Sequence, residues 1–138
     1  MIAPDSPNLF NALFAFHPRE GYTPRENFLS EAFAHVLRTV NGACEAWVSK
    51  LIGSPTPLLT SRILTRCSED GVFPDLKIEA AAASGEGLTI YAEHKWDSPC
   101  NEQQLQNYAD IAKKSRGTPY LVFVGARLDQ VGAAKTAK

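Results

Sequence analysis

Leu88-Thr-Ile-Tyr-Ala-Glu-His-Lys95 and Phe73-Pro-Asp-Leu-Lys-Ile78 are the two segments that decide the fold. Both are rich in apolar and β-favouring residues, which predicts strands at about 75–80 and 88–95. Residues two apart on a strand share a face, so Glu93 and Lys95 project to the same side. A mostly buried strand has no structural need for two opposite charges. The pair therefore indicates a functional site.

The segment between these strands, Ala81-Ala-Ala-Ser-Gly-Glu-Gly87, predicts a turn, because glycine adopts positive φ without strain. If the hairpin closes symmetrically about Ser84, Asp75 lies directly opposite Glu93. Facing side chains have Cβ atoms about 4.5–5.5 Å apart, and like charges there repel. Two facing carboxylates beside a lysine are best explained by a bound divalent cation, and oxygen ligands suit Mg²⁺ or Mn²⁺. A slip of one residue would move Asp75 to the other face, so the metal site depends on this register.

Pro74-Asp75 followed by Glu93-His94-Lys95 resembles the motif of the PD-(D/E)XK nuclease superfamily. The motif is short, and its specificity comes from its position on two adjacent predicted strands, in the expected order. With the flanking helices included, the resemblance covers residues from about Pro24 to Gly125. It implies an α/β, restriction-endonuclease-like fold with an αβββαβ core and a mixed β-sheet flanked by helices.

The resemblance also implies roles for single residues. Asp75, Glu93 and Lys95 are the expected catalytic residues. Asp75, Glu93 and the backbone carbonyl of His94 are the expected metal ligands. The side chain of His94 alternates away from Glu93, so we expect it on the other face of the sheet.

Composition bounds this interpretation. The chain has 138 residues, of which 44% are hydrophobic, so it is long and apolar enough to bury a core. We expect one domain over residues 1–138, with its core at about 24–125 and a flexible tail at 127–138. The net charge of −1 indicates that nucleic acid would contact a local basic patch, not the field of the whole molecule. No apolar run approaches a membrane span. An odd number of cysteines without metal-ligand spacing (Cys44, Cys67, Cys100) indicates reduced thiols and a cytoplasmic protein.

The remaining elements are predicted from capping residues and periodicity. We expect helices at 24–40, 43–53 and 98–114, strands at 60–68 and 119–125, and a short apolar, helical segment at 8–16. A last strand reached through a helix is the connection that parallel pairing requires, which predicts a mixed sheet.

Helical phase separates two acidic residues of the 24–40 helix. Its apolar positions define one face: Leu29, Ala32, Phe33, Val36, Leu37 and Val40. Glu26 falls within this stripe, whereas Glu31 points nearly opposite, toward solvent, with His35 and Arg38. Glu26 is either a capping or dipole partner or, as the resemblance implies, a glutamate that joins the metal site through water. We count Glu26 among the candidate catalytic residues.

Gln104 and Tyr108 are four residues apart and share one face of the 98–114 helix. A structural interpretation places Tyr108 in the core with Gln104 at its border. The spacing is also similar to the Gln-x3-Tyr motif of the exonuclease-like branch, which implies contact with the scissile phosphate or with water at the metal. We count Gln104 as a candidate catalytic residue and assign Tyr108 to the core. Arg62 and Arg66 are candidate phosphate contacts or solvated strand residues.

The expected function is hydrolysis of phosphodiester bonds in DNA by a nuclease that uses Mg²⁺ or Mn²⁺. The alternative is a catalytically inactive nuclease-like domain that binds DNA or protein. The motif does not determine whether DNA or RNA is cut, or whether cleavage is endonucleolytic or exonucleolytic. It also does not distinguish a role in restriction, repair or phage defense. The small size favours a core module that works with a partner domain or as a homodimer.

Overall fold

A computed structural model describes residues 9–14, 25–95 and 102–125 of the chain. The elements in chain order are α1 (Leu9–Phe14), α2 (Arg25–Thr39), α3 (Ala43–Ile52), β1 (Leu58–Thr65), β2 (Leu76–Ala82), β3 (Gly87–Lys95), α4 (Glu102–Lys113) and β4 (Thr118–Gly125). The tail expected at 127–138, the start of the 98–114 helix and Cys100 lie outside the described residues. No helix in the described ranges is long and apolar enough to cross a membrane.

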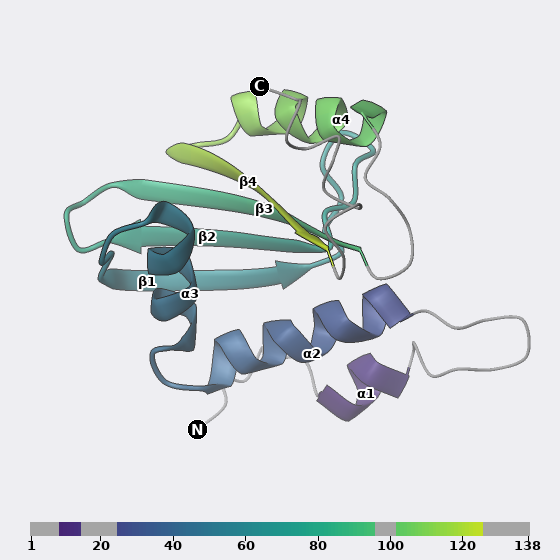
Figure 1. The fold of residues 1–138 in the computed structure, drawn as a ribbon, viewed down its shortest axis with the longest axis horizontal. Helices are drawn as coiled ribbons and strands as arrows, with labels where there is room; N and C mark the ends of the chain where they lie inside the picture. Colours follow the sequence, from purple (N-terminus) through teal and green to yellow (C-terminus); the bar gives the residue numbers. More distant parts are fainter. Residues whose placement is uncertain (1–8, 15–24, 96–101, 126–138) are drawn as a thin grey trace, which may run out of the picture.

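The four strands form one mixed sheet in the order β1-β2-β3-β4 (Figure 1). The pairs β1–β2 and β2–β3 are antiparallel, and β3–β4 is parallel. The helix α4 makes the crossover between the two parallel strands, as such a connection requires. The predicted αβββαβ order, the mixed sheet and the flanking helices are therefore confirmed.

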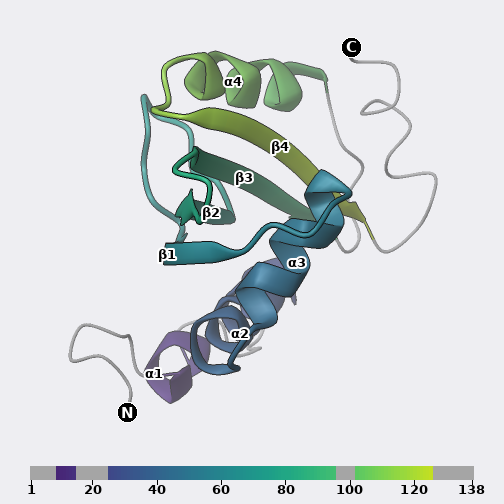
Figure 2. The same ribbon diagram turned by 90° about the vertical axis from the view of Figure 1, so that its left-hand side faces the viewer.

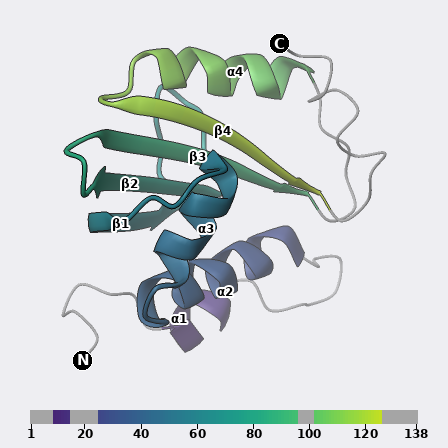
Figure 3. The same cartoon turned by 60° about the vertical axis from the view of Figure 1, so that its left-hand side comes forward.

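The larger core lies between one face of the sheet and the helices α2 and α3. It joins side chains from α2, α3 and the first three strands: Ala34, Leu37, Cys44, Val48, Ile63, Leu76, Ile78, Ala80, Ala82, Leu88, Ile90 and Ala92. In β2 and β3 these are alternate residues, because successive side chains of a strand point to opposite faces. Figures 2 and 3 show α2 and α3 below and beside the strands, with α1 packed on α2. Cys44 and Cys67 are free thiols.

A smaller core lies on the opposite face, beneath α4. Tyr91 of β3 packs there with Tyr108, Ile111 and Ala112 of α4. Figure 1 shows α4 at the β4 end of the sheet, away from α1 and α2. Since Glu93 and Lys95 alternate with the apolar-core residues of β3, they share this second face with Tyr91.

The predicted phase of the first long helix is only partly right, because Leu37 is buried in the larger core and Phe33 packs against that core, but other members of the stripe are exposed. Leu29, Val36 and Val40, which were expected in its buried stripe, are 43%, 43% and 54% exposed. The buried positions of α2 include Ser30 and Glu31, which are 1% and 7% exposed. Ser30, which is hydrogen-bonded across the fold, shares the contact between α2 and the sheet with the apolar Ala34 and Leu37, so a hydrophobic stripe gives only part of the orientation.

Glu31, His35 and Arg38 were expected to form a solvent-exposed charge cluster, and they do not, because Glu31 is buried and the other two are half-buried. The Arg38 guanidinium donates to the carbonyl oxygen of Ile63 from Nη2 at 2.7 Å and from Nε at 3.2 Å, which ties α2 to β1. The strand β1 ends at Thr65, and Arg66 has a φ of 52°, so Arg66 does not continue the alternation with Arg62.

Candidate active site

The β2–β3 register brings Asp75 and Glu93 together. Leu76 pairs with Ala92, and the pairing continues without a shift to Ala81 and Gly87, as predicted from a hairpin centred on Ser84. One step further places Asp75 opposite Glu93. Asp75 Oδ2 accepts a hydrogen bond of 2.8 Å from the backbone amide of His94. The two carboxyl groups are close enough to share a hydrogen bond.

Three side chains donate to the Glu93 carboxylate, which is buried. Gln104 Nε2 lies 2.6 Å from Oε1, and Lys95 Nζ lies 3.2 Å from the same oxygen. The Tyr108 hydroxyl donates to Oε2. The predicted neighbours Glu93, Lys95 and Gln104 therefore do converge, and Tyr108 joins them although we had assigned it only to the core.

The charge balance of this cluster explains the proton affinity of Asp75. Burial, and then the neighbouring Glu93 carboxylate, raise the pKa of Asp75 from 3.8 to about 7. The His94 amide and the Lys95 ammonium oppose this increase without cancelling it. Below about pH 7, Asp75 thus keeps its proton in the folded protein.

Tyr108 keeps its proton for a related reason. Burial and its bond to Glu93 raise the pKa of the phenol, so the hydroxyl stays neutral and acts as a donor. The same hydroxyl lies 3.4 Å from the carbonyl oxygen of Phe73, two residues before Asp75. Tyr108 therefore borders the Asp75 loop, while its one proton is donated to Glu93.

The side chain of His94 lies on the opposite face, as predicted. Its Nδ1 is hydrogen-bonded to Ser30 Oγ of α2 at 2.7 Å, and its ring packs edge-on against Phe33. Ser30 therefore anchors α2 to the strand end that carries Glu93 and Lys95. The sequence analysis missed Ser30, because a serine in a helix gives no signal until its partner across the fold is known.

Glu31 follows Ser30 and is also buried, contrary to the expectation that it faces solvent. Within the described part of the chain, its carboxylate has no hydrogen bond or ion pair with another residue. Burial lowers the pKa of the Arg38 guanidinium. The negative charge of Glu31 opposes this shift but does not cancel it. Glu26 lies in the first turn of α2, but its side chain is outside the described residues. Glu31 is thus a buried acid on the helix that Ser30 joins to β3.

A tight turn positions the loop before Asp75. Glu69 and Val72 exchange two backbone hydrogen bonds of 2.8 Å. Asp70 and Gly71, between them, have φ values of 50° and 78°, the left-handed conformations that favour an Asp-Gly pair in this kind of turn. The turn leads directly into Phe73 and the candidate site.

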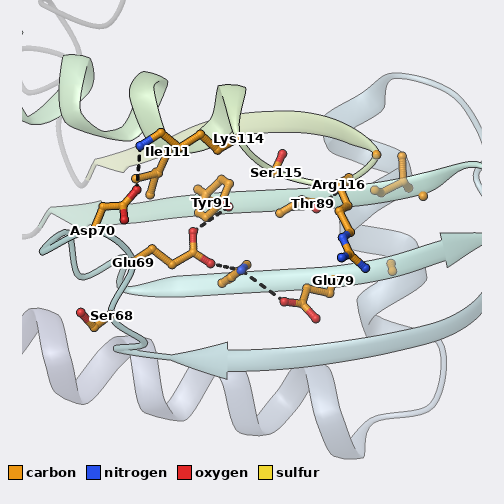
Figure 4. A pocket seen from close by; sticks show the side chains of 15 residues that line it. Ser68, Glu69, Asp70, Glu79, Thr89, Tyr91, Ile111, Lys114, Ser115 and Arg116 are labelled. Carbon is orange, nitrogen blue, oxygen red and sulfur yellow. Dashed lines mark hydrogen bonds and ion pairs between the residues drawn. The ribbon is translucent and has the colours of Figure 1, made fainter.

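Side chains of the same turn bind the sheet and α4 around a hollow of about 800 Å³ (Figure 4). Glu69 accepts hydrogen bonds from Lys77 and from the Tyr91 hydroxyl, and Asp70 pairs with Lys114 at 2.9 Å. Lys77 also pairs with Glu79, at 3.2 Å. Because these charges are matched within the chain, the contacts of Glu69 and Asp70 serve to hold the turn, and with it Asp75, in place.

The donor set suits a divalent cation bound with water. Among the described residues, no three His, Cys, Asp or Glu side chains gather as metal ligands. Asp75 and Glu93 supply two adjacent carboxylates, and a carboxylate has about four lone-pair sites. The three donors to Glu93 and the His94 amide that donates to Asp75 leave acceptor sites on both groups. Hard oxygen ligands with waters completing the coordination are what Mg²⁺ prefers.

Comparison with protein-family models, with curated proteins and with solved structures finds no match to this chain. The functional interpretation therefore rests on the geometry of the site and on the motif.

Proposed function

We propose that this protein is a metal-dependent nuclease of the PD-(D/E)XK type that hydrolyses phosphodiester bonds of DNA. The observation that carries the proposal is the convergence of Asp75, Glu93 and Lys95 at one end of the β2–β3 hairpin. Burial and the adjacent Glu93 raise the pKa of Asp75, and such perturbed acids are concentrated at functional sites. The free thiols of Cys44 and Cys67 fit a reducing compartment, and we place the protein in the cytoplasm.

Asp75 and Glu93, with the backbone carbonyl of His94, would hold the cation. Bound Mg²⁺ or Mn²⁺ would supply Lewis-acid chemistry, lowering the pKa of water and neutralising phosphate charge. Gln104 and Tyr108 hold the Glu93 carboxylate in one orientation through their hydrogen bonds. A fixed acid of this kind needs no rearrangement when substrate binds.

Lys95 contributes a positive charge at the same edge. Its ammonium lies 3.2 Å from Glu93 Oε1, and its side chain is only 11% exposed. A phosphate at this site would meet the ammonium directly. In a partly desolvated site such a charge stabilises the extra negative charge of the transition state, or orients the attacking water.

Cleavage of labelled DNA in the presence of Mg²⁺ tests the proposal. We expect the wild-type protein to cut, and we expect Asp75→Asn and Glu93→Gln to lose at least a hundredfold in rate. Glu79→Gln is the matched control, because Glu79 lies on the same sheet face but pairs with Arg62 and Lys77. Duplex and single-stranded DNA and RNA of one sequence are compared in the same assay.

The outcomes separate the two functions considered. Mg²⁺-dependent cleavage that fails in both acid variants supports the nuclease. DNA binding without cleavage in the wild type overturns it and favours the inactive binding module. Cleavage that survives Asp75→Asn overturns the assigned site.

A further inference from the structure

A second, smaller hollow adjoins the candidate active site. Its volume is about 310 Å³, and it is lined by loop residues 71–73 and by Gln103, Gln104, Asn107 and Tyr108 of α4. Two of these residues, Gln104 and Tyr108, also hold Glu93. The volume is at the lower end of the range for small-molecule sites, about 300–1,000 Å³. We call this space the Phe73 hollow.

Phe73 presents an aromatic ring to solvent at the edge of this hollow. It is 62% exposed, and neither core cluster of the described residues includes it. Its backbone lies beside the candidate site, because its carbonyl oxygen is 3.4 Å from the Tyr108 hydroxyl and Asp75 follows two residues later. The ring contributes little to packing, so its exposed face is free to stack with a ligand.

The opposite wall carries amide groups. Gln103 Nε2 donates to Asn107 Oδ1 at 2.9 Å, one helical turn away. An amide side chain has one carbonyl acceptor and two N–H donors, so this pair still offers at least one acceptor and one donor to a ligand. A donor beside an acceptor matches the edge of a nucleobase.

We propose that the Phe73 hollow binds one unpaired nucleobase of the substrate strand, next to the phosphate that is cut. The base stacks on the Phe73 ring, and the Gln103–Asn107 pair contacts its edge. Aromatic stacking of unstacked bases is the usual way in which proteins hold single strands. This inference rests on the proposed function and narrows its substrate to single-stranded DNA or to the unpaired overhang of a duplex.

Fluorescence anisotropy with labelled oligothymidylate in EDTA tests binding without cleavage. We expect Phe73→Ala and Phe73→Leu to weaken single-strand binding by about tenfold, the loss of one stacked base, whereas Phe73→Trp restores it. Leucine keeps apolar bulk but lacks the π face, which separates stacking from simple hydrophobic contact. Leu59→Ala is the control, because Leu59 is 69% exposed on β1. Thermal melts of each variant verify folding, which an exposed ring should not affect.

Equal affinity of Phe73→Leu and wild type for the single strand would overturn the inference. So would an equal loss for a blunt duplex. One outcome is that the wild type cleaves DNA, and that Phe73→Leu binds and cleaves single strands as well as the wild type does. This outcome would overturn the proposed base-binding site and support the proposed nuclease activity. The opposite outcome is that the wild type shows no cleavage, while Phe73→Leu loses affinity for the single strand. This outcome would support the base-binding site and overturn the proposed nuclease activity.

Discussion

The Tyr108 hydroxyl of α4 donates to Oε2 of Glu93 in β3, so one hydrogen bond joins the helix to the central acid of the candidate site. Because Tyr108 is also buried with Tyr91 and Ile111, the same side chain packs the smaller core and orients the site. The core interpretation of this tyrosine is therefore confirmed, and its hydrogen bond to Glu93 is a contact that the core interpretation alone did not predict.

We expect Tyr108→Phe to lower the free energy of unfolding by about 1.5–3 kcal/mol, the range for a hydrogen bond to a charged group. The turnover number for DNA cleavage should decrease about tenfold with little change in KM, since Glu93 loses an orienting donor but no substrate contact. Urea denaturation and steady-state kinetics measure the two effects. Tyr120→Phe in β4 is the control. Unchanged turnover would show that the hydroxyl does not position Glu93.

Lys95→Ala should abolish cleavage and also reduce stability. The side chain of Lys95 is only 11% exposed, and its ammonium is paired with the buried Glu93. Removing one partner of a buried pair leaves the other charge uncompensated, which costs about 3–5 kcal/mol. The loss should be smaller at pH 5 than at pH 8, because Asp75 is protonated at pH 5. Lys113→Ala, at the exposed end of α4, is the control, and cleavage by Lys95→Ala at the wild-type rate would exclude a catalytic role.

Local patterns were sufficient to predict the hairpin that carries the site. Alternation in 75–80 and 88–95, with glycines between them, determined a register that the structure reproduces from Leu76 and Ala92 onward. The same register placed His94 on the opposite face from Glu93. Strand periodicity predicts the register because one face of the hairpin must be buried, and a shift of one residue would expose that face to solvent.

The orientation of α2 could not be predicted in this way. Ser30 and Glu31 are buried, while Leu29 and Val36 are largely exposed. The helix is oriented by the hydrogen bond between Ser30 and His94 and by Arg38 on the carbonyl of β1. These partners are distant in sequence, so a hydrophobic stripe cannot reveal them.

We therefore reverse the predicted ranking of the two glutamates in α2. Glu31 is 7% exposed and follows the serine that contacts His94, so Glu31→Gln should lower metal-dependent cleavage more than tenfold, about 1.4 kcal/mol of transition-state stabilisation. Glu26→Gln should have a smaller effect. Parallel cleavage assays compare the two, with the exposed Glu86 substituted by Gln as a control. A larger effect from Glu26→Gln would instead support the helical phase predicted from the sequence, in which Glu26 faces the site.

The raised pKa of Asp75 predicts that stability decreases as pH rises. Between its ordinary pKa of 3.8 and its native value of about 7, the folded protein holds a proton that the unfolded chain has released. The free energy of unfolding should therefore decrease from about pH 4 to pH 7, by at most roughly 1.4 kcal/mol per pH unit from this group, and then level off. Urea denaturation without divalent ions should show a flatter profile for Asp75→Asn. A wild-type profile that rises over this range would contradict the assignment.

A divalent cation should compete with the proton of Asp75. At pH 5 the acid is protonated and binds metal poorly, whereas at pH 8 the proton is lost and two adjacent carboxylates are available. We expect Mg²⁺ or Mn²⁺ to raise the melting temperature more at pH 8 than at pH 5, because a ligand stabilises the state that it binds. In Asp75→Asn the shift should be lost at both pH values, and in the control Glu79→Gln it should match wild type. A metal-induced shift of equal size at the two pH values would show that the cation binds elsewhere than at Asp75 and Glu93.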